Sequence, residues 1–228
     1  MIVHKFNDLI VENVGKKYGL NVKNKTILFT DIKGSSELWK SSEAEMFKNL
    51  NKLEILISKI CDLNNGLILK TIGDSFMISF DKLIDAINFS IELQEEKPLK
   101  VKGNDIVNRI GFCSGQVYEL ETERQGQKLK DYFGNVVNTA SRMESKVSDV
   151  SGFAFAYIGK IDNKDEIDAL LKEKCKISVI DYKEKCSVKD DKRMRSGRLL
   201  LDSHKHLCEH LSELKGVDET TAYKCNLK

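Results

Sequence analysis

The sequence predicts an α+β protein built on one sheet, and three observations support this class. Short apolar runs of strand length alternate with longer runs that have helical spacing. Two of the strand runs, within residues 67–80, flank a Gly-Asp turn and predict a β-hairpin. The resulting order is strand, helix, hairpin, helix, strand. We therefore expect a sheet with its helices packed on one face.

The elements follow in order from the N-terminus. Residues 1–24 have no clear pattern, and we expect a helix or an arm there. Residues 26–30 form a buried strand that ends at Asp31, and a long helix follows with Ser35 or Ser36 as its N-cap. Beyond the hairpin, the same signals predict a helix at 84–93, strands at 106–114 and 116–120, a polar arm or loop at 121–130, a helix from 134 to about 145, a strand at 153–158, a helix at 167–174, a strand at 177–182, a charged loop at 183–197 and a helix at 199–214.

The composition fits one globular domain without an extreme charge. A chain of 228 residues can bury one substantial core, and its net charge of +2 gives no strong attraction to nucleic acid or to a membrane surface. No apolar run approaches the length of a membrane span, and no signal peptide is visible. The six Cys include no C-x-x-C pair, which indicates reduced thiols. We therefore expect a cytoplasmic protein.

Two carboxylates are expected to converge at one end of the sheet. Asp31 ends the first strand, and Asp74 lies in the hairpin turn. Neighbouring carboxylates repel each other unless a cation lies between them, and hard divalent cations take such oxygen ligands. The small residues after Asp31 open a helix whose backbone N–H groups suit phosphate oxygens. The alternative is that each Asp caps a turn, which is a common role of this residue.

Three further polar residues are candidates for a site. Lys70 is a single cation in an apolar strand, where a charge is costly unless it has a partner or a function. Asn138 and Arg142 are four residues apart on one helical face, where an amide beside a guanidinium suits a sugar oxygen and a phosphate. A structural ion pair for Lys70 and a solvated polar face for the other two are the alternatives.

Together these segments resemble the class III nucleotidyl cyclases, the adenylate and guanylate cyclase catalytic domain family, from about residue 25 to 158. Four motifs occur in the order and spacing of that family: Phe-Thr-Asp-Ile-x-Gly-Ser from Phe29, Lys-Thr-Ile-Gly-Asp-x-Phe-Met from Lys70, Arg-Ile-Gly-x-x-Ser-Gly from Arg109 and Asp-Tyr-Phe-Gly-x-x-Val-Asn-x-Ala-Ser-Arg from Asp131. The resemblance implies a ferredoxin-like βαββαβ core with additional strands, working as a head-to-tail homodimer. Residues 25–183 would be the catalytic domain, and residues 184–228 a charged loop and a C-terminal helix.

The resemblance also implies a reaction and roles for single residues. The ribose 3′-hydroxyl of ATP would attack the α-phosphorus, giving 3′,5′-cyclic AMP and pyrophosphate, with the help of two Mg²⁺ or Mn²⁺ ions. Asn138 would orient the ribose, and Arg142 would stabilise charge on the transferring phosphorus. The expected metal ligands are Asp31, Asp74 and the backbone carbonyl of Ile32, and the expected phosphate-binding residues are Lys33, Gly34, Ser35 and Ser36.

Lys70 and Asp131 match the base-selecting pair of the family. Adenine offers an acceptor at N1 and a donor at its 6-amino group, while Lys only donates and ionised Asp only accepts, so the pair fits adenine. Guanine presents the reverse pattern, and guanylate cyclases of the family typically have Glu at the position of Lys70. Cytosine also offers an amine beside an acceptor. A pyrimidine cyclase of the kind that acts in anti-phage signalling is therefore the second interpretation.

The family assembles each active site from two subunits. The metal aspartates come from one subunit and the base-selecting pair, with the Asn and Arg, from the other. A homodimer with two equivalent sites is thus implied, and residues 121–130 would embrace the partner. The late Gly-flanked Lys that grips the triphosphate in the family is not found, so a degenerate nucleotide-binding module is the third interpretation. His206 and His210, with Cys208 or Cys186, are a weaker zinc candidate, because a polar helix face explains the same spacing.

Overall fold

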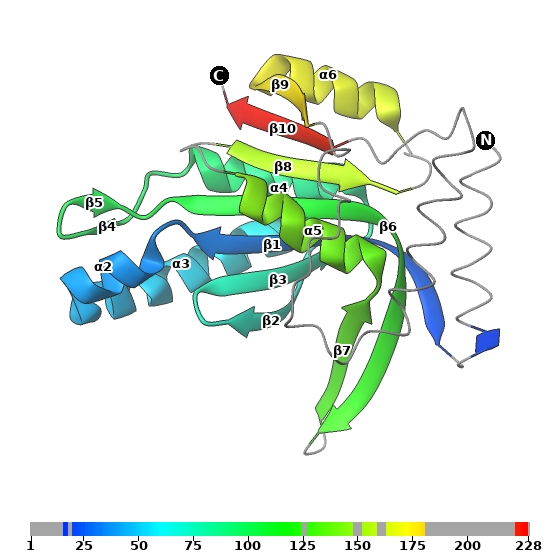
Figure 1. Ribbon diagram of the computed structural model, residues 1–228, viewed down its shortest axis with the longest axis horizontal. Coiled ribbons are helices and arrows are strands. Elements are labelled where there is room, and N and C mark those ends of the chain that lie inside the picture. The colour runs from blue at the N-terminus through cyan, green and yellow to red at the C-terminus, as the bar shows by residue number, and fades with distance from the viewer. Residues whose placement is uncertain are drawn as a thin grey trace, which may run out of the picture.

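The protein, seen here as a computed structural model, has a mixed α+β fold around one eight-stranded sheet (Figure 1). The structure describes residues 16–17, 20–124, 127–147, 152–158, 163–180 and 222–227. The strands of the sheet are β1 (Asn21–Ile32), β2 (Leu67–Ile72), β3 (Ser75–Phe80), β6 (Asn108–Arg124), β7 (Gln127–Phe133), β8 (Gly152–Tyr157), β9 (Cys175–Ile180) and β10 (Ala222–Leu227). A small second sheet holds β4 (Lys100–Val101) and β5 (Asn104–Asp105). The helices are α2 (Ser35–Ser41), α3 (Glu43–Leu63), α4 (Leu83–Glu95), α5 (Asn135–Lys146) and α6 (Lys164–Lys174).

The topology confirms the predicted α+β class. The sheet runs β2-β3-β1-β6-β8-β10-β9, with β7 paired to β6 off this path. Its first four strands, with α3 and α4 between them in sequence, form the expected βαββαβ core. Within that core β1 pairs antiparallel with both β3 and β6, whereas β6 pairs parallel with β8.

Several predicted elements have different limits in the structure. The long helix breaks into α2 and α3, because Ser42 caps α3 by accepting a hydrogen bond from the Glu45 backbone N–H at 3.4 Å. α2 begins after Gly34 without a side-chain cap, so the N-cap predicted at Ser35 or Ser36 is wrong. The two strands predicted between residues 106 and 120 are one continuous strand, β6. The polar segment 121–130 belongs to the β6–β7 hairpin, which projects from the sheet as an arm (Figure 1).

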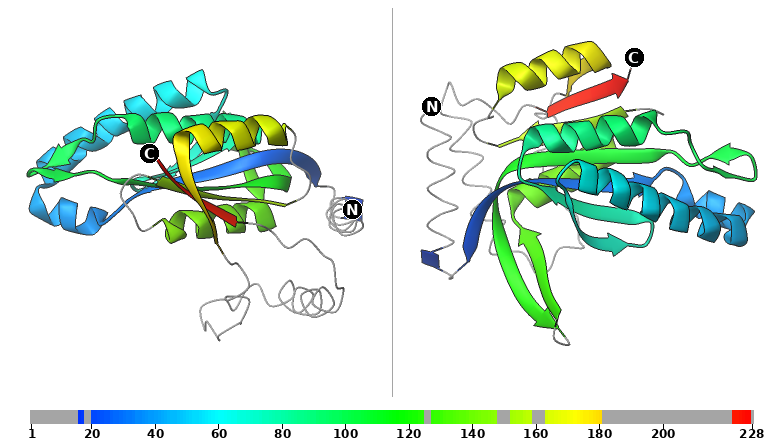
Figure 2. Two further views of the ribbon diagram at one scale, coloured as in Figure 1. Left: turned by 90° about the horizontal axis from the view of Figure 1, so that it is seen from above. Right: turned by 180° about the vertical axis from the view of Figure 1, so that it is seen from behind.

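The helices lie on both faces of the sheet, which corrects the expectation of a single covered face. Figure 2 shows α3, α4 and α6 on one face and α5 on the other. β10 corrects a second expectation, because only a charged loop and a helix were predicted for residues 184–228. In the sheet, β10 lies between β8 and β9. The helix predicted at 199–214 and most of residues 1–24 lie outside the described residues, although β1 begins at Asn21.

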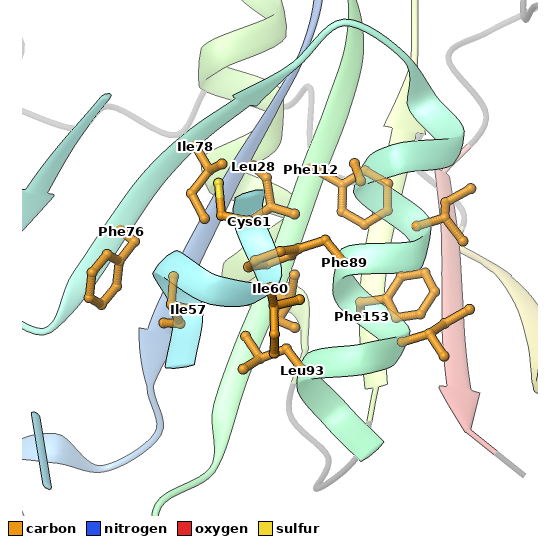
Figure 3. Packing of buried hydrophobic residues seen from close by; sticks show 14 of the residues in the cluster. Leu28, Ile57, Ile60, Cys61, Phe76, Ile78, Phe89, Leu93, Phe112 and Phe153 are labelled. Carbon is orange, nitrogen blue, oxygen red and sulfur yellow. The ribbon is translucent and has the colours of Figure 1, made fainter. Parts of the chain in front are cut away.

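A large apolar core joins the sheet to α3 and α4 (Figure 3). Phe112 on β6 stacks with Phe155 on β8, with ring centroids 5.3 Å apart, and Phe89 on α4 is fully buried. These contacts fix the strands whose other face carries the polar residues discussed below. None of the helices in the described part of the chain is long and apolar enough to cross a membrane.

Candidate active site

A β-bulge turns Lys70 away from the apolar core. In the β2–β3 hairpin the register shifts between Ile68, which lies opposite Ile78, and Lys70, which lies opposite Met77. Ile68 packs against the α3–α4 core, whereas Met77 belongs to the cluster that includes residues of α5. Without the extra residue, strand alternation would place Lys70 on the same face as Ile68. The bulge therefore places the cation on the α5 face of the sheet.

Lys70 forms an ion pair with Asp131, which is 61 residues further along the chain. The Lys70 Nζ donates to Asp131 Oδ2 at 2.6 Å. Asp131 lies on β7, and its Oδ1 accepts a hydrogen bond from the Tyr132 backbone N–H at 2.9 Å. The side chains of Lys70 and Asp131 remain 41% and 32% exposed, so a ligand can reach both partners. The structure thus brings together the two residues that the motifs assign to base selection.

The register of β1 and β3 brings Asp31 next to the turn that carries Asp74. Thr30 pairs with Phe76, so Asp31 lies beside Ser75, whose Oγ donates a hydrogen bond to Asp31 Oδ1 at 2.8 Å. Asp74 occupies the second position of the two-residue turn. Gly73, at the first position, has a φ of 65°, a left-handed conformation that favours glycine.

These carboxylates fit a hard divalent cation. Asp74 Oδ2 is buried and has no hydrogen-bond partner among the described residues. A buried carboxylate oxygen without a partner is costly, and a bound cation would remove that cost. The described part of the chain holds no group of three or more His, Cys, Asp or Glu side chains placed to bind a metal. A metal site here would therefore depend on two carboxylates, completed by backbone oxygen and by ligands from outside the chain.

Arg109 lies beside the metal candidates, and the sequence motifs did not single it out as a site residue. Its guanidinium forms an ion pair with Asp31, the residue opposite it in the β1–β6 register. On its other side, Nε lies 2.8 Å from Glu144 Oε1 of α5. Burial raises the pKa of Glu144, and the positive charge of Arg109 offsets part of this rise. The available signal was the one that identified Lys70, a cation in an otherwise apolar strand.

The predicted phosphate-binding turn has a backbone shape of its own. Gly34 adopts a left-handed φ of 67° and accepts hydrogen bonds from the Glu37 and Leu38 N–H groups at 3.0 and 3.3 Å. The Lys33 N–H donates to the Val107 carbonyl at 2.9 Å, so this donor is already engaged. Phosphate binding by Lys33 would therefore use its side chain, and the roles of Gly34, Ser35 and Ser36 stay predictions.

Asn138 and Arg142 lie one turn apart on the exposed side of α5, which confirms the predicted shared face. The buried side of this helix carries Val136, Ala140 and Met143, which pack on the sheet. The two polar residues therefore project away from their own sheet, toward solvent or toward another molecule.

The cysteines of the described core are structural. Cys61, Cys113, Cys175 and Cys225 are all buried and form no disulfide among the described residues. Burial raises the pKa of the Cys61 thiol to about 11, which keeps it protonated at neutral pH. The zinc candidates His206, His210, Cys208 and Cys186 lie outside the described residues.

The known proteins that this chain resembles are adenylate and guanylate cyclases. A sequence model of the adenylate and guanylate cyclase catalytic domain matches residues 18–196, and so continues past residue 158, where the motifs end. Adenylate cyclases of Mycobacterium tuberculosis (strain ATCC 25618 / H37Rv) and Neurospora crassa are each 26% identical, over 163 and 141 residues. The matches cover 65% and 53% of this chain but only 33% and 6% of the relatives, so the chain spans a minor part of each.

Solved structures show the same fold. The catalytic core of a rhodopsin-guanylyl cyclase with converted specificity, in complex with ATPαS, has a TM-score of 0.59 at 22% identity and covers 92% of this chain and 98% of its own. A bacterial light-regulated adenylyl cyclase has a TM-score of 0.55 at 20% identity, covering 70% of this chain and 84% of its own. Similar folds thus include cyclases named for either purine.

Proposed function

The chain belongs to the family of adenylate and guanylate cyclase catalytic domains, and from that premise we propose that it converts ATP to 3′,5′-cyclic AMP and pyrophosphate. In this reaction the ribose 3′-oxygen bonds to the α-phosphorus and its proton is lost. The bond between the α-phosphorus and the bridging oxygen breaks, and pyrophosphate leaves. The observation that supports ATP as the substrate is the Lys70–Asp131 pair, which remains accessible to a ligand.

The base would be recognised by exchange of partners at this pair. Lys70 can donate to N1 of adenine, and Asp131 can accept from the 6-amino group. The two side chains satisfy each other without a ligand, so neither charge is left unpaired before the nucleotide arrives. A guanine edge presents a donor at N1 and an acceptor at position 6. To bind guanine, Lys70 would have to face position 6 and Asp131 would have to face N1, the reverse of the arrangement for adenine.

Asp31, Asp74 and the Ile32 carbonyl are the groups that would hold two Mg²⁺ or Mn²⁺ ions, whose chemistry is to lower the pKa of the 3′-hydroxyl and to neutralise phosphate charge. Without a metal ion, Arg109 neutralises Asp31 through their ion pair. Its guanidinium can bind phosphate oxygens through two parallel hydrogen bonds. We infer that Arg109 contacts the triphosphate, the role that the late Lys fills in the family and for which the sequence showed no match.

Asn138 and Arg142 would act on a nucleotide held by a second subunit. Both are exposed on α5, on the side opposite the residues that pack on the sheet. In a head-to-tail homodimer, α5 of one subunit would face the metal carboxylates of the other, giving two equivalent sites. Asn138 would orient the ribose, and Arg142 would stabilise charge on the α-phosphorus.

A product assay tests the proposal. Purified protein is incubated separately with ATP, GTP, CTP and UTP, with Mn²⁺ and then with Mg²⁺, and the products are identified by mass spectrometry. We expect cyclic AMP from ATP. The matched controls are Asp74→Asn, which should abolish product, and Asp81→Asn, which makes the same change at the other end of β3 where Asp81 pairs with Lys25.

The other outcomes separate the alternatives. A cyclic pyrimidine or cyclic GMP as the main product would retain the reaction and overturn the base assignment. No product from any of the four nucleotides, with a folded dimer shown by light scattering, would contradict the enzyme and favour a nucleotide-binding module.

A further inference from the structure

Arg109 is held between two carboxylates from different parts of the chain. One is Asp31 on β1, and the other is Glu144 on α5, 2.8 Å away from Arg109 Nε. The side chain of Glu144 is only 14% exposed, and both atoms of the Arg109–Glu144 contact are buried. The contact is an ion pair without hydrogen-bond geometry, so charge alone links the two groups. Burying a carboxylate is costly unless a cation accompanies it, so the position of Glu144 depends on Arg109.

Gly111 brings Glu144 to this place. A Cβ atom on Gly111 would lie 1.8 Å from the backbone nitrogen of Glu144, so only glycine lets α5 pack this closely on β6. Arg109 is two residues before Gly111 and therefore lies on the same face of β6. The backbone contact fixes the C-terminal part of α5 above the Arg109 guanidinium. The position of Glu144 is therefore set by backbone packing and does not depend only on the rotamer of its side chain.

The two carboxylates that pair with Arg109 have different roles in the proposed reaction. Asp31 would be occupied by the metal ions, and Arg109 would then lose that partner. Glu144 belongs to no expected ligand set and stays in place. We propose that Glu144 is a positioning residue that keeps Arg109 beside the β- and γ-phosphates of the bound nucleotide. This proposal rests on the proposed function, because it requires a triphosphate in the site.

A purely structural pair would behave differently. If Glu144 only fastens α5 to the sheet, its loss would weaken every ligand equally or lower stability alone. If it positions Arg109, its loss would affect only ligands that carry the outer phosphates. The comparison therefore needs two ligands that share base, sugar and α-phosphate.

The experiment measures binding without turnover. 3′-Deoxy-ATP lacks the attacking hydroxyl, and 3′-deoxy-AMP lacks in addition the β- and γ-phosphates. Their dissociation constants are measured by calorimetry at saturating Mn²⁺ for the wild type, Glu144→Gln, Arg109→Met and the double variant. Glu144→Gln should raise the dissociation constant of 3′-deoxy-ATP about tenfold and that of 3′-deoxy-AMP less than about twofold, and it should have no effect in the Arg109→Met background.

Two further variants keep the test decisive. Glu95→Gln removes a carboxylate from another ion pair, with Lys174 at 3.4 Å, and should leave both constants unchanged. Arg109→Lys keeps the charge but removes the fork that spans two carboxylates, so it should reproduce the loss even if Glu144→Gln does not fold.

Two outcomes would overturn the proposal. These are an equal loss for both ligands and an undiminished loss in the Arg109→Met background. Failure of the wild type to bind 3′-deoxy-ATP would instead overturn the proposed function, and this inference with it.

Discussion

The two faces of the sheet are built from the same strands but carry different kinds of side chain. Toward α3 and α4, the buried residues are large and apolar, such as Leu28, Phe112 and Phe153. Toward α5, the buried residues include small ones, such as Ala154 and Ala156. Asp31, Arg109, Glu144, Lys70 and Asp131 lie on this second side.

The difference arises because alternate side chains of one strand point to opposite faces of the sheet. In β1, Leu28 packs in the core, and Asp31, three residues later, faces α5. In β6, Phe112 stacks in the core, and Arg109 joins the polar cluster. The α3–α4 face carries the larger apolar side chains, and the α5 face also positions charge. Substitution of the charged residues should therefore affect activity more than stability, and substitution of the large apolar residues the reverse.

The largest expected effect is on activity from the α5 face. Asp74→Asn should lower kcat by about a thousandfold, because several kcal/mol of charge stabilisation would be lost. Its midpoint of urea unfolding should stay the same or rise, since the negative charge on the buried, unpartnered oxygen is removed. A variant that unfolds with a lower midpoint while keeping wild-type kcat would reverse the assignment of the two faces.

The opposite face should show a loss of stability. Phe112→Ala should reduce the free energy of unfolding by about 3–5 kcal/mol, because it leaves a cavity among stacked rings. Phe133→Ala makes the same change at a residue that is 47% exposed and should cost below about 1 kcal/mol. Equal costs at the two positions, measured by urea denaturation, would contradict the difference in packing.

Substitution of Gly111 tests the close contact between α5 and β6. Gly111→Ala should cost about 3 kcal/mol or more, because its Cβ would overlap the Glu144 backbone and α5 would have to move. Gly103→Ala, where the added carbon has open space and φ is 84°, should cost about 1–2 kcal/mol. A smaller cost at Gly111 than at Gly103 in the same denaturation experiment would show that α5 does not pack this closely.

Lys70 should affect specificity more than stability. Lys70→Met should change the free energy of unfolding by less than about 1 kcal/mol, because the ion pair is partly exposed. The ratio of kcat/KM for ATP to that for GTP should fall at least about tenfold, since the donor to N1 is lost. Lys100→Met removes a comparable pair, with Asp105 at 2.8 Å, and should leave the ratio unchanged. An unchanged ratio in Lys70→Met would remove this residue from base selection.

The local pattern predicted much of the core of the fold. The hairpin, its Gly-Asp turn and the amphipathic helices follow from signals within a few residues of each other. Ser42-x-x-Glu45 is a readable capping signature, and it gives the break that the predicted long helix lacked.

Other features depend on contacts that no local pattern contains. Periodicity shows which side of α5 is buried, but the choice of sheet face depends on the approach of Glu144 to Gly111. The bulge before Lys70 is likewise visible only as a register shift against β3. β10 pairs with β8 and β9, which are both far from it in sequence.

In the proposed homodimer, each active site combines the carboxylates of one subunit with α5 of the other. This arrangement is tested most directly by mixing two variants, Asp74→Asn and Asn138→Ala, each of which should be inactive alone. The mixture is unfolded, refolded together and assayed for cyclic AMP. Random pairing would make half of the dimers mixed, each with one intact site, so about a quarter of wild-type activity should return. No recovered activity, with mixed dimers shown by mass spectrometry, would contradict the shared site.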